Sequence, residues 1–139
     1  MDGIYFVLKN FNLTCSFKFS QSDIVAFALT TGDHNPLHLD EEFASRTVFK
    51  RPIVQGLLAG SIFTKFLQSE FPCNGFIYTK QTFEFLRPMY VDVEYEVTFC
   101  VQHIDTQRRI AEIFGEIRNV SSRKVTLRGV TTIMLGPFD

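Results

Sequence analysis

The alternation of apolar and polar residues near the start of the chain predicts a strand over residues 4–18. Six apolar side chains stand at odd positions there, namely Tyr5, Val7, Phe11, Leu13, Phe17 and Phe19. A period of two is typical of a half-buried strand. The alternation breaks at Lys9 and Cys15, and Asn10 marks a turn or bulge.

A helical pattern follows at once. Ser20 and Asp23 have the spacing of a capping box, although Glu or Gln is more usual at the second position. Apolar or small residues then share one helix face: Ile24, Phe27, Ala28 and Thr31. Gly32 stands just after the last of them, where a glycine commonly ends a helix. The pattern predicts a helix from about residue 20 to residue 31.

The segment between residues 33 and 55 is long for a connection inside a compact domain, and long ordered loops are usually functional. Pro36 and Pro52 exclude a continuous helix. Residues 40–44 suit one short helix, because acidic side chains occupy its first turn. We expect this segment to overhang the rest of the domain.

A second helix is predicted from Gly56 to Phe71, about 23 Å long. Its residues are apolar or small around most of the circumference, which predicts burial on nearly all sides. The remaining chain reads as four strands, at residues 75–86, 91–104, 109–120 and 123–135, separated by turn signals.

These elements predict a five-stranded, mainly antiparallel sheet wrapped around one long central helix. This is the hot-dog arrangement, of the α+β class. A length of 139 residues fits one domain, covering residues 1–139.

Composition and charge exclude several partners. The net charge is −1 and the basic pairs at residues 108–109 and 123–124 are small and separated, so nucleic acid is not indicated. The longest mostly apolar run, residues 52–63, is too short to span a membrane. Three cysteines without a C-x-x-C spacing, and a first segment without signal-peptide features, indicate a cytoplasmic protein.

The densest polar segment, Thr31 to Asp40, contains a carboxylate at Asp33 and an imidazole at His38. Adding water to a double bond conjugated to a thioester needs a base for the water and a proton for the α-carbon. Asp33 and His38 could hold one water between them and perform both proton steps. The charge on the thioester oxygen also needs donors, and the backbone at Gly56, where the central helix begins, offers them.

Other interpretations of the same residues stay open at this stage. Gly-Asp-x-Asn-Pro is also a strong turn signal. Asp33, His34, His38 and Asp40 are metal-ligand types, but Pro36 opposes a helix that would carry both histidines, and we predict no metal. No nucleophile elbow is present, so Ser61 is not expected to act as a nucleophile. No glycine-rich dinucleotide motif or P-loop is present either, so no cofactor is expected.

The run GDHNPLHLDEEFA resembles the signature of the MaoC-like (R)-specific enoyl-CoA hydratases, also called hydratase 2, in Gly32, Asp33, Asn35, Pro36, Leu37, His38 and Ala44. RPIVQGLLAGS resembles the family's entry to the central helix. The resemblance implies that Asp33 and His38 hold the catalytic water and that Asn35 orients the loop or the water.

The resemblance also implies roles on the central helix. The Gly56 amide would bind the thioester carbonyl, and a helix hydroxyl would assist, with Thr64 the closer match and Ser61 the second. Gln55 would have a supporting role, although many members have His there.

The activity implied is hydration of a trans-2-enoyl thioester to the (R)-3-hydroxyacyl thioester, and the reverse. The substrate carrier would be CoA or acyl carrier protein. The protein would be a homodimer joined through sheet edges, or a higher homo-oligomer. One alternative is a hot-dog thioesterase, which usually has its carboxylate on the central helix, where only Glu70 is acidic. The other is a non-catalytic acyl-thioester-binding subunit, which Gln55 keeps open.

Overall fold

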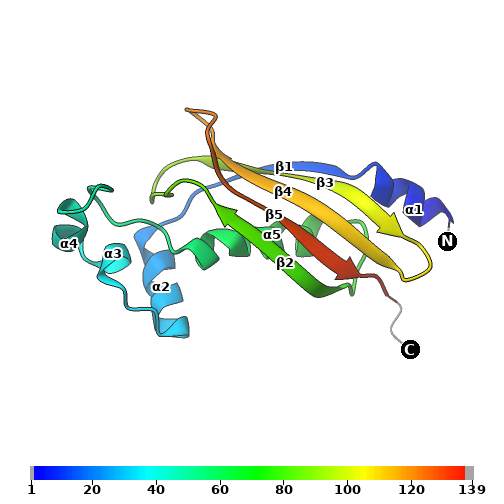
Figure 1. The fold of residues 1–139 in the computed structure, drawn as a ribbon, viewed down its shortest axis with the longest axis horizontal. Helices are drawn as coiled ribbons and strands as arrows, with labels where there is room; N and C mark the ends of the chain where they lie inside the picture. The colour runs from blue at the N-terminus through cyan, green and yellow to red at the C-terminus, as the bar shows by residue number, and fades with distance from the viewer. Residues whose placement is uncertain (1, 137–139) are drawn as a thin grey trace.

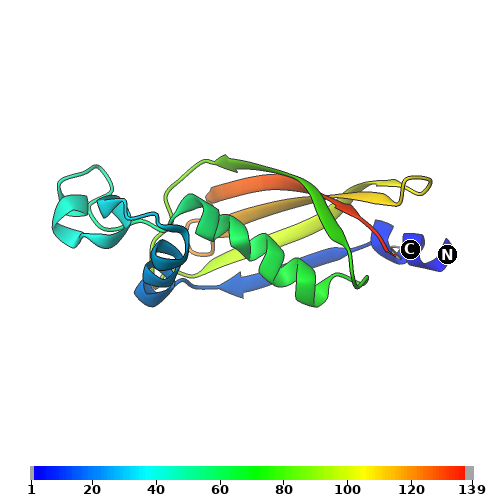
Figure 2. The same cartoon turned by 90° about the horizontal axis from the view of Figure 1, so that it is seen from below.

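One long helix lies across a face of a five-stranded sheet in the computed structural model, which describes residues 2–136 (Figure 1; Figure 2). The helix is α5 (Gly56–Glu70). The strands are β1 (Asn12–Phe17), β2 (Ile77–Phe85), β3 (Tyr95–Asp105), β4 (Ile110–Asn119) and β5 (Val125–Met134). They are ordered β1-β3-β4-β5-β2, and all four pairings are antiparallel. The predicted hot-dog arrangement is confirmed.

Alternate residues of β3 and β4 face α5 and form the core with it. Tyr95, Val97 and Phe99 of β3 are almost fully buried. Phe63 and Leu67 of α5 are at most 2% exposed. The buried alternate side chains of the strands and the inward face of α5 therefore form one apolar layer. Burial of this layer supplies most of the driving force for folding.

Two glycines leave room for neighbouring elements to lie close together. Gly115 on β4 stands opposite Gly129 on β5. A Cβ at Gly115 would lie 2.6 Å from Cζ of Phe63 on α5, so this glycine lets the helix approach the sheet. A Cβ at Gly129 would meet the backbone carbonyl of Thr82 on the neighbouring strand β2, and would lie 3.0 Å from Cδ1 of Phe83. Residues larger than glycine therefore do not fit at either position without a shift.

The predicted strand over residues 4–18 is wrong in its first half. Residues Asp2–Lys9 form the helix α1, and only Asn12–Phe17 pair as β1. Leu8 is fully buried against the sheet, whereas Phe6 is 71% exposed. Asn10 does end the first element, because its Nδ2 donates to the carbonyl of Phe6 at 2.8 Å.

The predicted start and end of the central helix are confirmed to within one residue, but not its burial on nearly all sides. Leu57 is 64% exposed, and Ser61, Thr64 and Lys65 are exposed as well. Small and apolar residues alone therefore misled the prediction, because one face of α5 is left uncovered within a single chain.

Three helices lie beyond one end of the sheet, as predicted for the overhanging segment (Figure 1). They are α2 (Gln21–Thr31), α3 (Pro36–Leu39) and α4 (Glu41–Ser45). Ser20 and Asp23 form the predicted capping box of α2, and Gly32 ends it at φ 79°. Helix α4 is the predicted short helix, with Asp40 as its N-cap. Helix α3 was not predicted.

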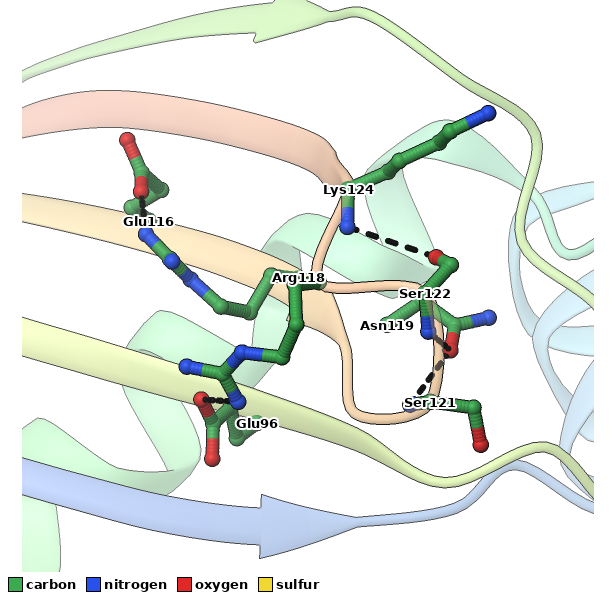
Figure 3. A network of polar contacts seen from close by, with 8 residues as sticks. Glu96, Glu116, Arg118, Asn119, Ser121, Ser122 and Lys124 are labelled. Carbon is green, nitrogen blue, oxygen red and sulfur yellow. Dashed lines mark hydrogen bonds and ion pairs between the residues drawn. The ribbon is translucent and has the colours of Figure 1, made fainter.

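The outer face of the sheet, away from α5, is polar near the β4–β5 hairpin (Figure 3). Arg118 pairs with Glu116 on the same strand, and Arg123 donates to Glu96 at 2.7 Å. Asn119 Oδ1 accepts two backbone N–H bonds inside the turn. Each of these partly exposed ion pairs contributes little stability, typically about 0–1 kcal/mol. Their charges make this face of the sheet hydrophilic. None of the helices within residues 2–136 is long and apolar enough to cross a bilayer.

Candidate active site

Asp33 is held by the turn that follows α2. Its N–H donates to Oγ1 of Thr31 at 3.3 Å, and its Oδ1 accepts the N–H of Asn35 at 3.2 Å. Both bonds are local, so the short sequence around Gly32 positions the carboxylate. The second carboxylate oxygen has no partner within the described chain and is available to a bound molecule.

The side chain of Asn35 positions the next element, whereas its backbone N–H contacts the Asp33 carboxylate. Its Oδ1 accepts the N–H of Leu37 at 3.0 Å, and Pro36 occupies the first turn of α3. Proline is well tolerated at that position because its missing N–H would be unpaired anyway. The proline that excluded a helix containing both His34 and His38 therefore begins a one-turn helix that carries His38 alone.

His38 is 8% exposed, and its Nδ1 lies 2.8 Å from the carbonyl oxygen of Ile53. A carbonyl oxygen can only accept, so Nδ1 carries a hydrogen. Nε2 is thereby the ring nitrogen free to exchange a proton. His38 lines an apolar cavity of about 370 Å³, together with Phe49, Ile53, Val54, Gly56, Ala59, Phe85, Leu86, Arg87, Pro88, Met89, Thr126 and Leu127.

The N-terminus of α5 is open to a ligand. Gln55 is the N-cap residue, but its side chain makes no capping bond, and the first backbone bond of the helix is donated by Ala59. The N–H groups of Gly56 and the next two residues are therefore not used within the helix. A Cβ at Gly56 would lie 2.9 Å from Cε1 of Phe85, so the ring of Phe85 packs directly on this glycine.

Asp33 and His38 line adjoining spaces at this helix end. Asp33 lines a second cavity, of about 300 Å³, with Phe27, Thr31, Gln55, Gly56, Leu57 and Phe85. Gly56 and Phe85 are common to both cavities. The arrangement thus offers a carboxylate on one side, an imidazole on the other, and backbone N–H donors between them.

Gln55 is buried beside Asp33, at 2% exposure. Its Nε2 donates to the backbone carbonyl of Ile24 in α2 at 2.9 Å. Its Oε1 is buried and has no partner within residues 2–136. The side chain therefore ties α2 to the start of α5 and keeps one acceptor unused.

Two predicted residues lie away from this site within the single chain. Ser61 donates to the carbonyl of Leu58, and Thr64 donates to the hydroxyl of Tyr78 at 2.8 Å. Both line a separate hollow beside β2. Thr64 stands eight residues after Gly56, about 12 Å along the helix.

Sequence reasoning missed two parts of the site. Phe85 lines both cavities, but an aromatic residue at a strand end carries no distinctive signal. The Ile53 carbonyl fixes the imidazole, and only the fold brings it to His38. Within residues 2–136, no group of three or more His, Cys, Asp and Glu side chains could hold a metal ion.

Comparisons with known proteins show the family and the fold of this chain. The family model described as MaoC like domain matches residues 9–125. The (R)-specific enoyl-CoA hydratase of Aeromonas caviae is 42% identical over 100 residues, which are 72% of this chain and 75% of that protein. The 3-hydroxybutyryl-CoA dehydratase of Methylorubrum extorquens is 38% identical over 94 residues, 68% of this chain and 60% of that protein. The solved structure of the (R)-hydratase from A. caviae involved in PHA biosynthesis superposes with a TM-score of 0.85 at 32% identity, covering 91% of this chain and 95% of that one.

Proposed function

The chain belongs to the MaoC-like domain family, and on that premise we propose that it is a hydro-lyase that adds water to trans-2-enoyl thioesters. The product is the (R)-3-hydroxyacyl thioester, and the enzyme also runs the reverse dehydration. The relatives that carry these activities by name support the reaction class. The observation that carries the proposal is that His38 and Asp33 line two adjoining cavities that share Gly56, at the N-terminus of α5.

The thioester carbonyl binds at Gly56, where unpaired N–H groups stabilise the negative charge that develops on its oxygen. The apolar cavity beside His38 suits the apolar part of the substrate. Asp33 and His38 hold the water from two sides. The carboxylate accepts one hydrogen of the water, and the protonated ring donates from Nε2 to the water oxygen.

These residues can carry out every proton transfer that the reaction requires. The water oxygen bonds to the β-carbon while its proton moves to Asp33. The electrons of the double bond move toward the thioester oxygen. Nε2 of His38 delivers a proton to the α-carbon, the thioester carbonyl re-forms, and proton return from Asp33 to His38 resets the pair. Each positioned proton transfer typically contributes about 10²–10⁴-fold.

This chemistry needs no cofactor besides the carrier of the thioester. We propose CoA or acyl carrier protein as that carrier, with neither nucleic acid nor membrane as a partner. We also propose a cytoplasmic location. Its support is the three cysteines, which are all free thiols, as is usual in a reducing compartment.

We propose that the protein acts as a homodimer joined through β2. This strand is at an edge of the sheet, and Ile77 and Phe85 on it are 50% and 55% exposed. An edge with unpaired backbone and apolar side chains favours pairing. A second chain would cover the hollow that contains Ser61 and Thr64, where these hydroxyls would support the site. Light scattering should give twice the 16.0 kDa chain mass, and a monomer at micromolar concentration would contradict the pairing.

The reaction is tested by following enoyl-CoA absorbance and free thiol in the same sample, with crotonyl-, hexenoyl- and octenoyl-CoA. Loss of the conjugated chromophore without thiol release is expected. Thiol release would identify a thioesterase instead, although the only acidic residue on α5, Glu70, is at its far end. Binding with neither signal would identify a non-catalytic subunit.

A further inference from the structure

The buried amide of Gln55 has one end satisfied and one end free. Nε2 donates to the carbonyl of Ile24 at 2.9 Å, so the amide nitrogen is satisfied within the chain. Oε1 is buried without a hydrogen-bond partner among residues 2–136. Such an acceptor is costly to bury unless something that enters later donates to it.

The walls of the Asp33 cavity supply no side-chain donor to Oε1. Besides Gln55 itself, only Thr31 and Asp33 have polar side chains there. The Thr31 hydroxyl already donates to the carbonyl of Phe27 at 2.7 Å. An ionised Asp33 carboxylate is an acceptor only. Gln55 and Asp33 line the same cavity, and each has a side-chain oxygen without a donor among residues 2–136. A molecule with two O–H bonds matches these two acceptors.

On the basis of the proposed function, we infer that Gln55 Oε1 accepts the second hydrogen of the reacting water, which becomes the 3-hydroxyl hydrogen of the product. The first hydrogen goes to Asp33 as a proton. The second stays on oxygen throughout, because an amide oxygen accepts a hydrogen bond without taking the proton at neutral pH. With both hydrogens directed, the oxygen presents a lone pair to the β-carbon.

This role makes a selective prediction about ligands. Gln55 should favour a thioester with a 3-hydroxyl over the saturated thioester of the same length, which has no hydrogen to donate. A residue that acted only through the contact with Ile24 would affect both ligands alike. The ratio of the two inhibition constants therefore isolates the contact with the hydroxyl.

The experiment measures inhibition of enoyl-CoA hydration by (R)-3-hydroxyacyl-CoA and by saturated acyl-CoA, in the wild type and in Gln55→Met. The chain length is the one that the wild type hydrates fastest among C4, C6 and C8. We expect the inhibition constant of the hydroxy ligand to rise about five- to tenfold, the size of one neutral hydrogen bond, and that of the saturated ligand by less than about twofold. An equal change for both ligands, or no change, would overturn the role of Gln55.

Gln55→His is the second variant and covers a failure of Gln55→Met to fold. A neutral imidazole offers one donor and one acceptor, so it can keep both contacts, whereas its protonated form cannot accept. The preference for the hydroxy ligand should survive at pH 8 and fall below pH of about 6.5 in this variant, relative to the wild type. A preference that follows the wild type at every pH would contradict the inference. A wild type that hydrates none of the three substrates would overturn the proposed function, and this inference with it.

Discussion

His38 combines a structural contact at Nδ1 with proposed chemistry at Nε2, and one substitution separates them. In His38→Asn, the amide nitrogen takes the place of Nδ1 and can still donate to the carbonyl of Ile53, which lies 2.8 Å away in the wild type. No group remains at the position of Nε2. His38→Ala removes both. The two variants therefore differ in stability but share the loss of the proton donor.

The magnitudes follow from the surroundings of the ring. His38 is 8% exposed, so in His38→Ala the Ile53 carbonyl loses a buried partner, at a cost of about 1–3 kcal/mol in the free energy of unfolding. His38→Asn should stay within about 1 kcal/mol of the wild type. Turnover should fall by about 10²–10⁴-fold in both, which corresponds to about 2.7–5.4 kcal/mol in the activation barrier.

Urea unfolding followed by circular dichroism gives the stabilities, and enoyl-CoA absorbance gives the rates. His34→Asn is the matched control, because His34 is exposed and precedes α3. It should leave both quantities unchanged. Turnover of His38→Asn within about threefold of the wild type would refute the role of Nε2. Equal destabilisation of the Asn and Ala variants would refute the role given to Nδ1.

Three further outcomes are expected. Asp33→Asn keeps an oxygen that can accept the N–H of Asn35 but loses the negative charge, so turnover should fall by about 10²-fold or more. The free energy of unfolding should stay within about 1 kcal/mol of the wild type. Near-normal turnover would contradict the role of Asp33 as the base. Gly115→Ala should lower the free energy of unfolding by about 1–3 kcal/mol, because its Cβ would meet the buried ring of Phe63. The control Gly3→Ala has nothing within 4 Å of its Cβ and should not destabilise the protein. Equal effects of the two variants in urea unfolding would count against this packing. Burial raises the pKa of Tyr95, so deprotonation of its hydroxyl opposes folding, and the free energy of unfolding should fall as pH rises above about 10. Tyr95→Phe should weaken that fall. Identical slopes of urea midpoint against pH in the wild type and in Tyr95→Phe would contradict this prediction.

Local signals explain what the sequence predicted well. The capping box at Ser20 and the glycine at position 32 act within a few residues of themselves, so helix α2 could be placed. The start of α5 could be placed at Gly56 because a run of apolar and small residues begins there. The spacing of Asp33 and His38 also lies within one short loop. Their approach to the start of α5 depended on the family resemblance, because spacing alone allowed a simple turn.

Long-range contacts explain what could not be predicted. Residues 4–9 fit both a strand and a helix, and in the fold they belong to a helix that buries Leu8. The free face of α5 was taken as buried because apolar composition does not reveal which side a partner covers. The hydrogen bond from Gln55 to Ile24 joins residues 31 positions apart, so no local sequence pattern predicts it.

The stereochemistry of the product tests the central proposal most directly. The wild-type protein is given crotonyl-CoA in water, and the 3-hydroxybutyryl-CoA formed is assayed with (R)-specific and (S)-specific dehydrogenases. Because Asp33, His38 and the Gly56 amide would fix the water and the thioester relative to each other, we predict a single enantiomer. The proposed function makes it the (R) product, which the (R)-specific enzyme alone oxidises. Formation of the (S) product, or of both enantiomers equally, would contradict the proposed site.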